Sequence, residues 1–377
     1  IYRGLVGSEM CIRDSQIYED EILKIFDIFN LQYDKLLYQS KNLSVHQEYL
    51  EKLISTDLAY QSDDGPYKFR VKKDNDFFKY DDLILGEVKI PSNTIEDFSI
   101  ARSDKTPTFI LSNLIDDDFE NVTNVIRGND HTINTVKQKM LSNALNFKEI
   151  HYAHIPLIHD IEGKKLSKRD NITNVEDYLN DGYLAASIFN FIIKLGNNFN
   201  DIEYLNIDEA VKNFNLSKTV LSPAKFDIEK LNFINQYYLK ELSFSDFNKY
   251  LNKDVKNQVS SFKLEPIYKD ILERCHKYTE INLEVVKLYD FFKKNSVLEI
   301  DKNEKDLIKK IHTIINNLHD NDNTVSILEK NGLPLKKIGK IIRKITVNFE
   351  SKIPIEKIFI FFGIENIKER LLLYIND

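Results

Sequence analysis

The chain has 377 residues, and its 52 Lys and Arg against 59 Asp and Glu give a formal net charge of −7. A hydrophobic share of 42% excludes a disordered chain, while 11 Gly and 8 Pro exclude collagen-like and other low-complexity proteins. No apolar run approaches the about 18 residues that span a membrane, and 2 Cys cannot form a disulfide framework or a four-thiolate zinc site.

The N-terminal string IYRGLVGSEMCIRDS has neither helical nor alternating periodicity, and it lacks the apolar stretch of a signal peptide. It resembles translated sequencing-adapter read-through, and the composition shifts to Ile, Asn, Lys, Phe and Tyr from Gln16 onward. We therefore expect residues 1–15 to lie outside the fold; the alternative is a genuine but irregular N-terminal arm. Because the chain opens on Ile1, we also expect that the natural N-terminus is missing.

The next part of the chain mixes helix and strand signals. Apolar residues at helical spacing predict helices at 19–30 and 45–58, and short β-type runs (YKFRV, EVKI and FSIAR) follow between 67 and 102. From 106 to 160 strand and helix signals alternate, which predicts parallel α/β structure. The elements expected there are an apolar strand at 108–115, a strand at 122–127, a helix beginning near Thr132 and a strand at 153–159.

From about residue 175 to the end the pattern is almost entirely helical, with breaks near Gly196, Pro223, Pro266 and Gly332. The predicted fold class is therefore α/β with a small insert, followed by a long all-α half.

The string GKKLSKR, residues 163–169, is the most informative about function. A loop that is hinged at Gly163 and holds several ammonium groups can close over a phosphate chain and neutralise charge in a transition state. It is not a Walker A loop, because the spacing G-x-x-x-x-G-K-[ST] does not occur. Composition alone leaves two alternatives open, a solvated basic loop and a phosphate-closing loop.

The order of the letters KLSKR resembles the second signature, the KMSKS loop, of class I aminoacyl-tRNA synthetases in the form typical of the glutamyl enzymes. Further strings resemble bacterial glutamyl-tRNA synthetases in the same order and at similar spacing, so that the resemblance covers essentially 16–377. These strings are LYQSKNLSVHQEYLEKL (37–53), NVTNVIRGNDHTINTVKQ (121–138), HYAHIPLIHDIEGKKLSKRD (151–170), DGYLAASIFNFIIKLG (181–196) and SPAKFDIEKLNFINQYYL (222–239).

The resemblance implies a class I Rossmann-like catalytic domain, incomplete at its N-terminus, with a small α+β insert and an all-helical anticodon-binding domain. The implied ranges are a non-native segment at 1–15, a remnant of the first half of the catalytic domain at 16–57, the connective insert at 58–105, the second half with the KLSKR loop at 106–175, a stem-contact and helical domain at 176–285, and the anticodon-binding domain at 286–377.

For the loop, the resemblance implies that Lys168 contacts the ATP phosphates and stabilises the transition state at the α-phosphorus. Lys165 would assist, Ser167 would shape the loop, and Leu166 and Arg169 would complete the ATP-binding string. The alternative for Lys168 is a buried structural lysine.

For the amino acid and the nucleoside, the resemblance implies that Arg127 holds the carboxylate of the substrate glutamate, which suits a planar guanidinium. Asn113 and Phe109 would line the same pocket, with Phe109 standing where the family usually has Tyr. Asp130 and His131 would meet the ribose and adenine side of ATP. The alternative for Arg127 is a surface arginine in a turn. The alternative for Asn113 is a core amide whose hydrogen bonds are satisfied, and the alternative for His131 is a structural histidine.

Other departures from the family pattern bear on activity. The first signature, the HIGH motif, would precede residue 16, so we expect the chain as given to lack half of its ATP site. The segment between Tyr60 and Phe69 has no Cys, so we expect no zinc. Asp116 and Asp117 would lie at the rim of the active site rather than bind a metal, and we expect His154 to have a packing role.

Near the C-terminus, the string KNGLPLKKIGKIIRK (330–344) predicts a basic amphipathic helix, which is either solvated or lies along nucleic-acid phosphates. Its apolar stripe runs from Leu335 to Ile345. The resemblance makes Arg343 the candidate for reading the anticodon, with Lys336 and Lys340 as further tRNA contacts.

The resemblance implies a glutamate–tRNA ligase activity that uses ATP with Mg²⁺ and no zinc. The implied partners are L-glutamate and tRNA(Glu), and we expect a cytoplasmic monomer. Two alternatives stay open: a tRNA-binding protein without catalysis, and a non-discriminating enzyme that also charges tRNA(Gln).

Overall fold

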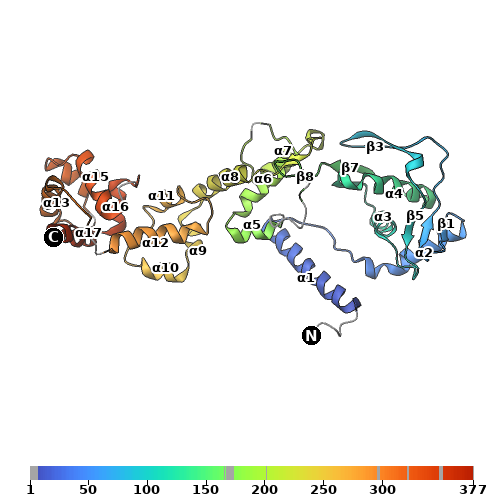
Figure 1. Ribbon diagram of the computed structural model, residues 1–377, viewed down its shortest axis with the longest axis horizontal. Coiled ribbons are helices and arrows are strands. Elements are labelled where there is room, and N and C mark those ends of the chain that lie inside the picture. Colours follow the sequence, from blue (N-terminus) through green and yellow to red (C-terminus); the bar gives the residue numbers. More distant parts are fainter. Residues whose placement is uncertain are drawn as a thin grey trace. The chain divides into compact units, whose positions relative to one another are not determined.

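The computed structural model describes residues 7–164, 166, 174–200, 202–294, 298–320, 322–347 and 351–376 (Figure 1). The chain forms two compact units, which are described separately below. The first unit comprises Ile1–Thr173 and Asn190–Asp227, and the second comprises Asn174–Phe189 and Ile228–Asp377. Helix α6 (Ala185–Gly196) contributes residues to both.

Four strands form the main sheet of the first unit: β3 (Phe77–Asp82), β4 (Gly86–Pro91), β6 (Asn124–Gly128) and β7 (His151–Ile155). Their order is β4-β3-β7-β6. Strands β3, β7 and β6 run parallel, and β4 is antiparallel to β3. The predicted parallel α/β structure is therefore confirmed. The register places Arg127 opposite His154, and Asp82 opposite Tyr152.

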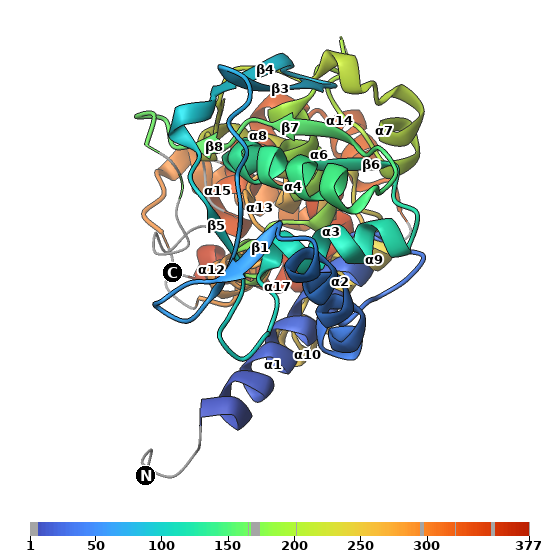
Figure 2. The same ribbon diagram turned by 90° about the vertical axis from the view of Figure 1, so that its right-hand side faces the viewer.

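Three helices of the first unit pack on one another, and one of them packs on this sheet. Helix α4 (Thr132–Leu145) packs against β3, and helix α3 (Phe109–Phe119) packs against α4 (Figures 1 and 2). Helix α2 (Leu43–Ser55) contacts both of these helices. A single apolar cluster joins the three helices to the strands, and its members include Leu50, Leu53, Leu111, Leu114, Val136, Leu141 and Tyr152.

The strand expected at 108–115 is wrong, because this segment lies in helix α3. Leu111, Leu114 and Ile115 are buried, at the three- and four-residue spacing of one helix face. The apolar run was long enough for either structure, and Thr108 in extended conformation marks the helix start behind Pro107.

The remaining strands of the first unit are short. They are β1 (Ala59–Gln61), β2 (Tyr67–Phe69) and β5 (Phe98–Ala101) in an antiparallel sheet, and the parallel pair β8 (Ile158–His159) and β9 (Ala224–Lys225). The predicted strand at 153–159 is thus divided in two, because Pro156 lacks the N–H that would continue the ladder. Strands β3 and β4 come from the range 58–105 but share the sheet of β7 and β6; the domain boundaries themselves stay a prediction.

Helix α1 (Gly7–Ile28) begins twelve residues earlier than the helix expected at 19–30. Residues 7–15 are thus helical although their sequence lacks helical periodicity, and that residues 1–15 lie outside the fold stays a prediction. Extending an existing helix costs little, because each added residue gains a hydrogen bond once a first turn has formed. The described side chains of α1 remain poorly packed: Ile17, Tyr18 and Ile22 are about half exposed, at 49%, 66% and 52%.

The second unit is helical, as predicted. Its helices are α5 (Val175–Asp181), α8 (Ile228–Glu241), α9 (Phe244–Tyr250), α10 (Lys253–Gln258), α11 (Tyr268–Leu272), α12 (Glu280–Lys293), α13 (Lys302–Ile315), α14 (Thr324–Lys330), α15 (Leu335–Thr346), α16 (Ile355–Phe362) and α17 (Ile364–Asn376). The first unit has one further helix, α7 (Ile207–Asn213). No helix among the described residues is long and apolar enough to cross a membrane.

One large apolar cluster connects the helices of the second unit from Leu184 to Tyr374. The predicted basic amphipathic helix is α15, where Ile338, Ile341 and Ile342 belong to this cluster. Leu335, the first residue of the expected stripe, is 40% exposed.

Candidate active site

Arg127 lies on β6 and is the centre of the candidate site. Its Nη2 donates to Thr135 Oγ1 at 2.5 Å and to Gln138 Oε1 at 2.8 Å, both on α4. Its Nε donates to His154 Nε2 of β7 at 3.5 Å. Its Nη1 makes no hydrogen bond to any residue that the structure describes. The side chain is therefore fixed along one edge and available for a ligand at the other.

Arg127 is a partly buried cation without an ion-pair partner among the described residues. The residue is partly buried, and burial lowers the pKa of its guanidinium, which nevertheless stays protonated. Within the described residues no carboxylate forms an ion pair with it, although a charge shielded from water normally has a partner. A carboxyl that raises the pKa of Arg127 is that of Asp117, whose own pKa burial raises to about 6, against the lowering effect of Arg127. This arrangement favours an anionic ligand.

The structure brings the other two predicted glutamate-pocket residues to the same place. Gln138 bridges Arg127 and Asn113, because its Nε2 donates to Asn113 Oδ1 at 3.0 Å. Phe109, at the start of α3, is 50% exposed, and its ring centroid lies 5.8 Å from that of His131. The predicted amino-acid and nucleoside residues are thus neighbours.

Asp130 and His131 lie in a short 3₁₀ turn (Asn129–His131) between β6 and α4. His131 Nδ1 lies 3.1 Å from Asn134 Nδ2. A Cβ on Gly128 would lie 2.7 Å from Asp130 Oδ1, so only glycine lets the Asp130 carboxylate fold back over the strand end. The turn therefore presents an acid and an imidazole beside Arg127.

The aspartates of the run Asp116–Asp118 do not converge. Asp116 Oδ1 accepts from Asn42 Nδ2 at 3.0 Å and lies 2.8 Å from Nε2 of the buried His46. Asp118 Oδ1 accepts from the backbone N–H of Lys148 at 3.3 Å. No group of three or more His, Cys, Asp or Glu that could hold a metal ion occurs in the described part of the chain.

Sequence reasoning missed the buried polar residues behind Arg127, which are Asp82, Thr135 and Gln138. Thr135 and Gln138 could have been found, because residues 131, 134, 135 and 138 share one face of a helix that begins near Thr132.

The catalytic residues predicted in the basic loop, Lys165, Ser167 and Lys168, lie outside the described residues, as does Arg169. The approach to the loop is described. Asp160 forms a tight turn in which its backbone N–H donates to Lys164 O at 2.9 Å and its Oδ1 accepts from Lys164 N at 2.8 Å. The backbone N–H of Leu166 then donates to Ile158 O of β8 at 3.2 Å.

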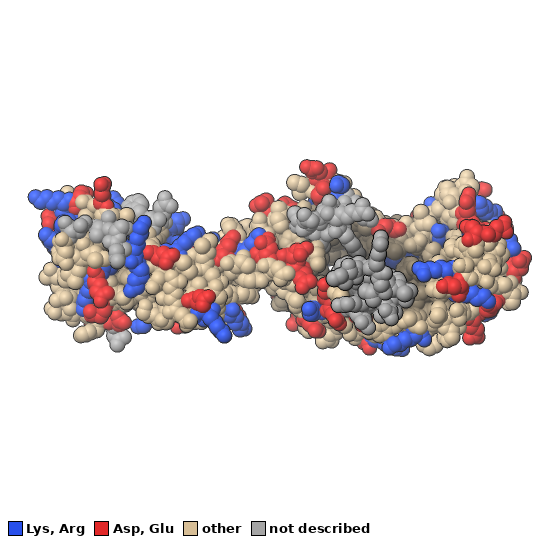
Figure 3. Space-filling view, turned by 60° about the horizontal axis from the view of Figure 1, so that its bottom comes forward, with Lys and Arg blue, Asp and Glu red and all other residues tan. Residues whose placement is uncertain are grey.

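The predicted tRNA contacts lie on α15 in the second unit. Lys336 and Lys340 are exposed, whereas Lys344 pairs with Glu304 at 2.8 Å. Arg343 is partly buried, and its Nε donates to Ile353 O at 3.1 Å. On the surface seen in Figure 3, cationic and anionic residues alternate within each unit and form no single basic face.

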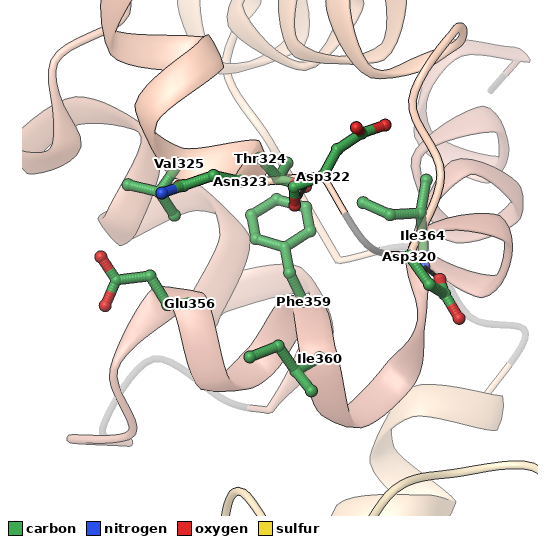
Figure 4. A pocket seen from close by; sticks show the side chains of 9 residues that line it. All are labelled: Asp320, Asp322, Asn323, Thr324, Val325, Glu356, Phe359, Ile360 and Ile364. Atoms are coloured by element: carbon green, nitrogen blue, oxygen red, sulfur yellow. Dashed lines mark hydrogen bonds between the residues drawn. The ribbon is translucent and has the colours of Figure 1, made fainter.

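A second pocket, of about 230 Å³, lies in the second unit between α14 and α16 (Figure 4). Phe359 and Ile360 form its apolar side, opposite the loop that leads into α14. Asp320 Oδ1 accepts from Ile364 N at 2.7 Å, and Asp322 Oδ2 accepts from His319 N at 2.7 Å. These carboxylates therefore hold the loop rather than face a ligand.

Comparisons with known proteins agree on one family. Residues 61–233 match the family described as class I tRNA synthetases (E and Q), catalytic domain. The chain is 33% identical over 370 residues to glutamate–tRNA ligase 1 of a Nitratiruptor species, covering 86% of this chain and 82% of that protein. It is 39% identical over 230 residues to glutamate–tRNA ligase 2 of Neorickettsia sennetsu, covering 61% of this chain and 56% of the relative.

Among solved structures, the fold is similar to that of a glutamate–tRNA ligase from Elizabethkingia meningosepticum in complex with its amino acid. The TM-score is 0.76 at 22% identity, and the match covers 95% of this chain and 89% of that one. The likeness extends over both units of the chain.

Proposed function

Since the chain belongs to the glutamate–tRNA ligase family of class I aminoacyl-tRNA synthetases, we propose that it takes part in the ATP-dependent joining of L-glutamate to tRNA(Glu). One observation on the molecule supports this most directly. Arg127 is a partly buried cation that lacks a carboxylate partner among the described residues and keeps Nη1 unused. A carboxylate of the substrate would complete it.

In the proposed reaction, the α-carboxylate of glutamate attacks the α-phosphorus of ATP, and pyrophosphate leaves. The terminal adenosine hydroxyl of tRNA then attacks the acyl carbon of the adenylate, and AMP leaves. Positioning and neutralisation of charge supply most of the rate enhancement in such transfers. Mg²⁺ bound to the nucleotide would neutralise part of the charge on its phosphates.

We assign the phosphate contacts to Lys168 and Lys165, with Ser167, Leu166 and Arg169 shaping the loop around them. Asp130 and His131 bind the nucleoside side of ATP. Arg127, Asn113 and Phe109 bind glutamate, and the hydrogen bonds that join Arg127 to Asn113 through Gln138 support that grouping.

We assign the anticodon contacts to Arg343, Lys336 and Lys340 of α15. The exposure of the two lysines supports this assignment. Arg343 Nε donates to a backbone carbonyl, and its terminal amino groups have no hydrogen-bond partner among the described residues, so that they can contact a base or a phosphate. We further propose that the protein works as a monomer in the cytoplasm, where its substrates are found.

The test is tRNA-supported exchange of pyrophosphate into ATP by the product of the complete gene. Lys168→Ala lowers the exchange rate by about 100-fold or more, as expected when a charge that stabilises the transition state is lost. Lys164→Ala is the matched control, because it removes an exposed ammonium four residues earlier. An unchanged rate in Lys168→Ala, with unchanged binding of tRNA, contradicts the role of the loop.

A further inference from the structure

Behind Arg127 lies a pair of buried ionisable side chains that the proposed reaction does not use. The side chains of Asp82 and His154 are both fully shielded from water, and Asp82 Oδ2 lies 2.5 Å from His154 Nδ1. The sheet register explains the pairing: Asp82 ends β3 beside Tyr152, and His154 follows two residues later on β7. The same register places His154 directly opposite Arg127 on β6.

The hydrogen bonds determine which nitrogen of His154 carries the proton. The other oxygen of Asp82, Oδ1, accepts from the backbone N–H groups of Ile84 and Leu85, each at 2.9 Å, and of His154 at 3.2 Å. Burial alone would raise the pKa of Asp82, but these donors and the His154 ring hold it below its usual value. The ionised carboxylate can only accept, so His154 Nδ1 must donate.

His154 is therefore the neutral Nδ1–H tautomer, and burial lowers its pKa against the raising effect of Asp82. Its Nε2 then has a free lone pair. This lone pair accepts from Arg127 Nε at 3.5 Å and from Thr135 Oγ1 at 2.9 Å. A hydrogen bond to one ring nitrogen thus determines what the other nitrogen can do.

We propose that Asp82, acting through His154, is a positioning residue for Arg127, which it holds by Nε so that Nη1 is left for the carboxylate of glutamate. This proposal rests on the proposed function. It differs from a packing role for His154, because it requires one tautomer and one acceptor rather than only a ring of the right shape.

Asp82→Asn tests the tautomer without changing the shape of the site. The Asn oxygen must stay on the three backbone N–H groups, so its Nδ2 faces His154 Nδ1 and donates to it. The proton of His154 then moves to Nε2, where it opposes the N–H of Arg127 Nε. We expect the glutamate KM to rise by about 10-fold or more, while kcat and the ATP KM change less than about 3-fold, because binding is lost equally in the ground and transition states.

Three further variants make the test specific. Asp81→Asn is the matched control, since Asp81 is the exposed neighbour on the same strand, and its glutamate KM stays at the wild-type value. His154→Asn keeps a donor for Asp82 but removes the acceptor of Arg127, so it raises the glutamate KM as Asp82→Asn does. In an Arg127→Lys background, Asp82→Asn has no further effect, because two changes that act through one contact are not additive.

Nitrogen NMR of the His rings gives a readout that does not depend on activity, with His154→Asn identifying the His154 signal among the 8 His. The expected result is an Nδ1–H ring in the wild type and an Nε2–H ring in Asp82→Asn. If Asp82→Asn shifts the tautomer but leaves the glutamate KM unchanged, the positioning role alone is overturned. The same holds if Asp82→Asn lowers the melting temperature and raises the KM values of glutamate and ATP equally. If the product of the complete gene activates no glutamate, the proposed function is overturned and this proposal with it.

Discussion

Each unit of the chain contains an arginine that is at least partly buried, and the two are held by different kinds of partner. Arg370, on α17 of the second unit, is 4% exposed. Its Nε donates to Ile345 O at 2.9 Å, its Nη1 donates to Lys294 O, and its Nη2 donates to Tyr374 Oη at 3.4 Å. Arg127, in the first unit, bonds to side chains through Nε and Nη2, and its Nη1 has no hydrogen-bond partner among the residues that the structure describes.

The partners of Arg370 explain its role. Ile345 lies in the last turn of α15, and Lys294 follows the end of α12. The carbonyls at helix C-termini lack partners within the helix and carry partial negative charge, so a buried cation between two such ends satisfies both. All three side-chain nitrogens of Arg370 donate to the protein, which suits a residue that stabilises the fold, whereas Arg127 has a nitrogen without a partner among the described residues, which suits it to bind a ligand.

The surroundings of the two arginines also differ, because those of Arg370 are mainly apolar and those of Arg127 include several polar side chains. Arg370 lies next to the large apolar cluster of the second unit, which contains Leu371 and Tyr374. Near Arg127 the interior includes the buried polar residues Asp82, Thr135, Gln138 and His154. Buried polar groups cost free energy unless every one is hydrogen-bonded, so the interior near Arg127 depends on the hydrogen bonds that these four side chains make.

The largest expected effects on the free energy of unfolding and on activity come from replacing each arginine by Met. Arg370→Met leaves the carbonyls of Ile345 and Lys294 buried without donors, and we expect it to lower the free energy of unfolding by about 3 kcal/mol. Arg127→Met removes a poorly hydrated cation but leaves Gln138 Oε1 without its donor, so the two effects oppose each other and the loss is about 1 kcal/mol or less.

Urea unfolding followed by far-ultraviolet circular dichroism measures both variants. Exchange of pyrophosphate into ATP should show the reverse order, with a large loss for Arg127→Met and little for Arg370→Met where the protein is folded. Equal losses of stability would break the distinction between the two arginines.

How far the sequence predicts these features depends on whether their partners are local. Helix α15 and its buried Ile338, Ile341 and Ile342 were predictable from period alone, and so was the position of Arg127 at a strand end. The partners of Arg370 lie 25 and 76 residues away, and no pattern within one helix indicates them.

The candidate site, too, depends on partners that are distant in sequence and that local patterns do not predict. The pairing of Asp82 with His154 spans 72 residues and depends on the order β3-β7-β6, which periodicity does not give. The segment 108–115 was wrongly predicted as a strand because a short apolar run is compatible with both structures, and only the packing of α3 on α4 decides between them.

Asp117 sharpens the comparison, because it is the protein carboxylate that could neutralise Arg127. A true ion pair would hold the pKa of Asp117 low, but burial instead raises it to about 6, with Asp116 adding to the rise. Because folding raises the pKa of this carboxyl, the folded protein loses stability as the pH increases from about 3.9, the pKa in the unfolded chain, through 6. We therefore expect Asp117→Asn to stabilise the protein by about 1 kcal/mol at pH values above 7.

The gain should shrink below about pH 6 and vanish near pH 4, where Asp117 is protonated in the folded wild type. Melting temperatures of both proteins across this range measure it. A destabilised Asp117→Asn variant at alkaline pH would show that Asp117 is, after all, the counterion of Arg127.

The smallest effect concerns Phe109, where the family usually has Tyr. The Phe109 ring is half exposed and lies beside His131, close to the pocket assigned to glutamate. Phe109→Tyr adds one hydroxyl, and a single net hydrogen bond is worth about 1 kcal/mol, so we expect the glutamate KM to fall by about 3- to 10-fold. Phe119→Tyr is the matched control, because Phe119 ends the same helix and is 62% exposed.

A lower KM in Phe109→Tyr alone means that the ring lies over the substrate and that glutamate is held between α3 and Arg127. An unchanged KM places the substrate away from α3. In that case Nη1 of Arg127 has to meet its carboxylate from the side of the turn Asn129–His131, and Asn113 loses its assignment to the glutamate pocket along with Phe109. The same pair of measurements therefore tests from which side the ligand reaches Nη1 of Arg127, the nitrogen whose lack of a partner among the described residues separates Arg127 from Arg370.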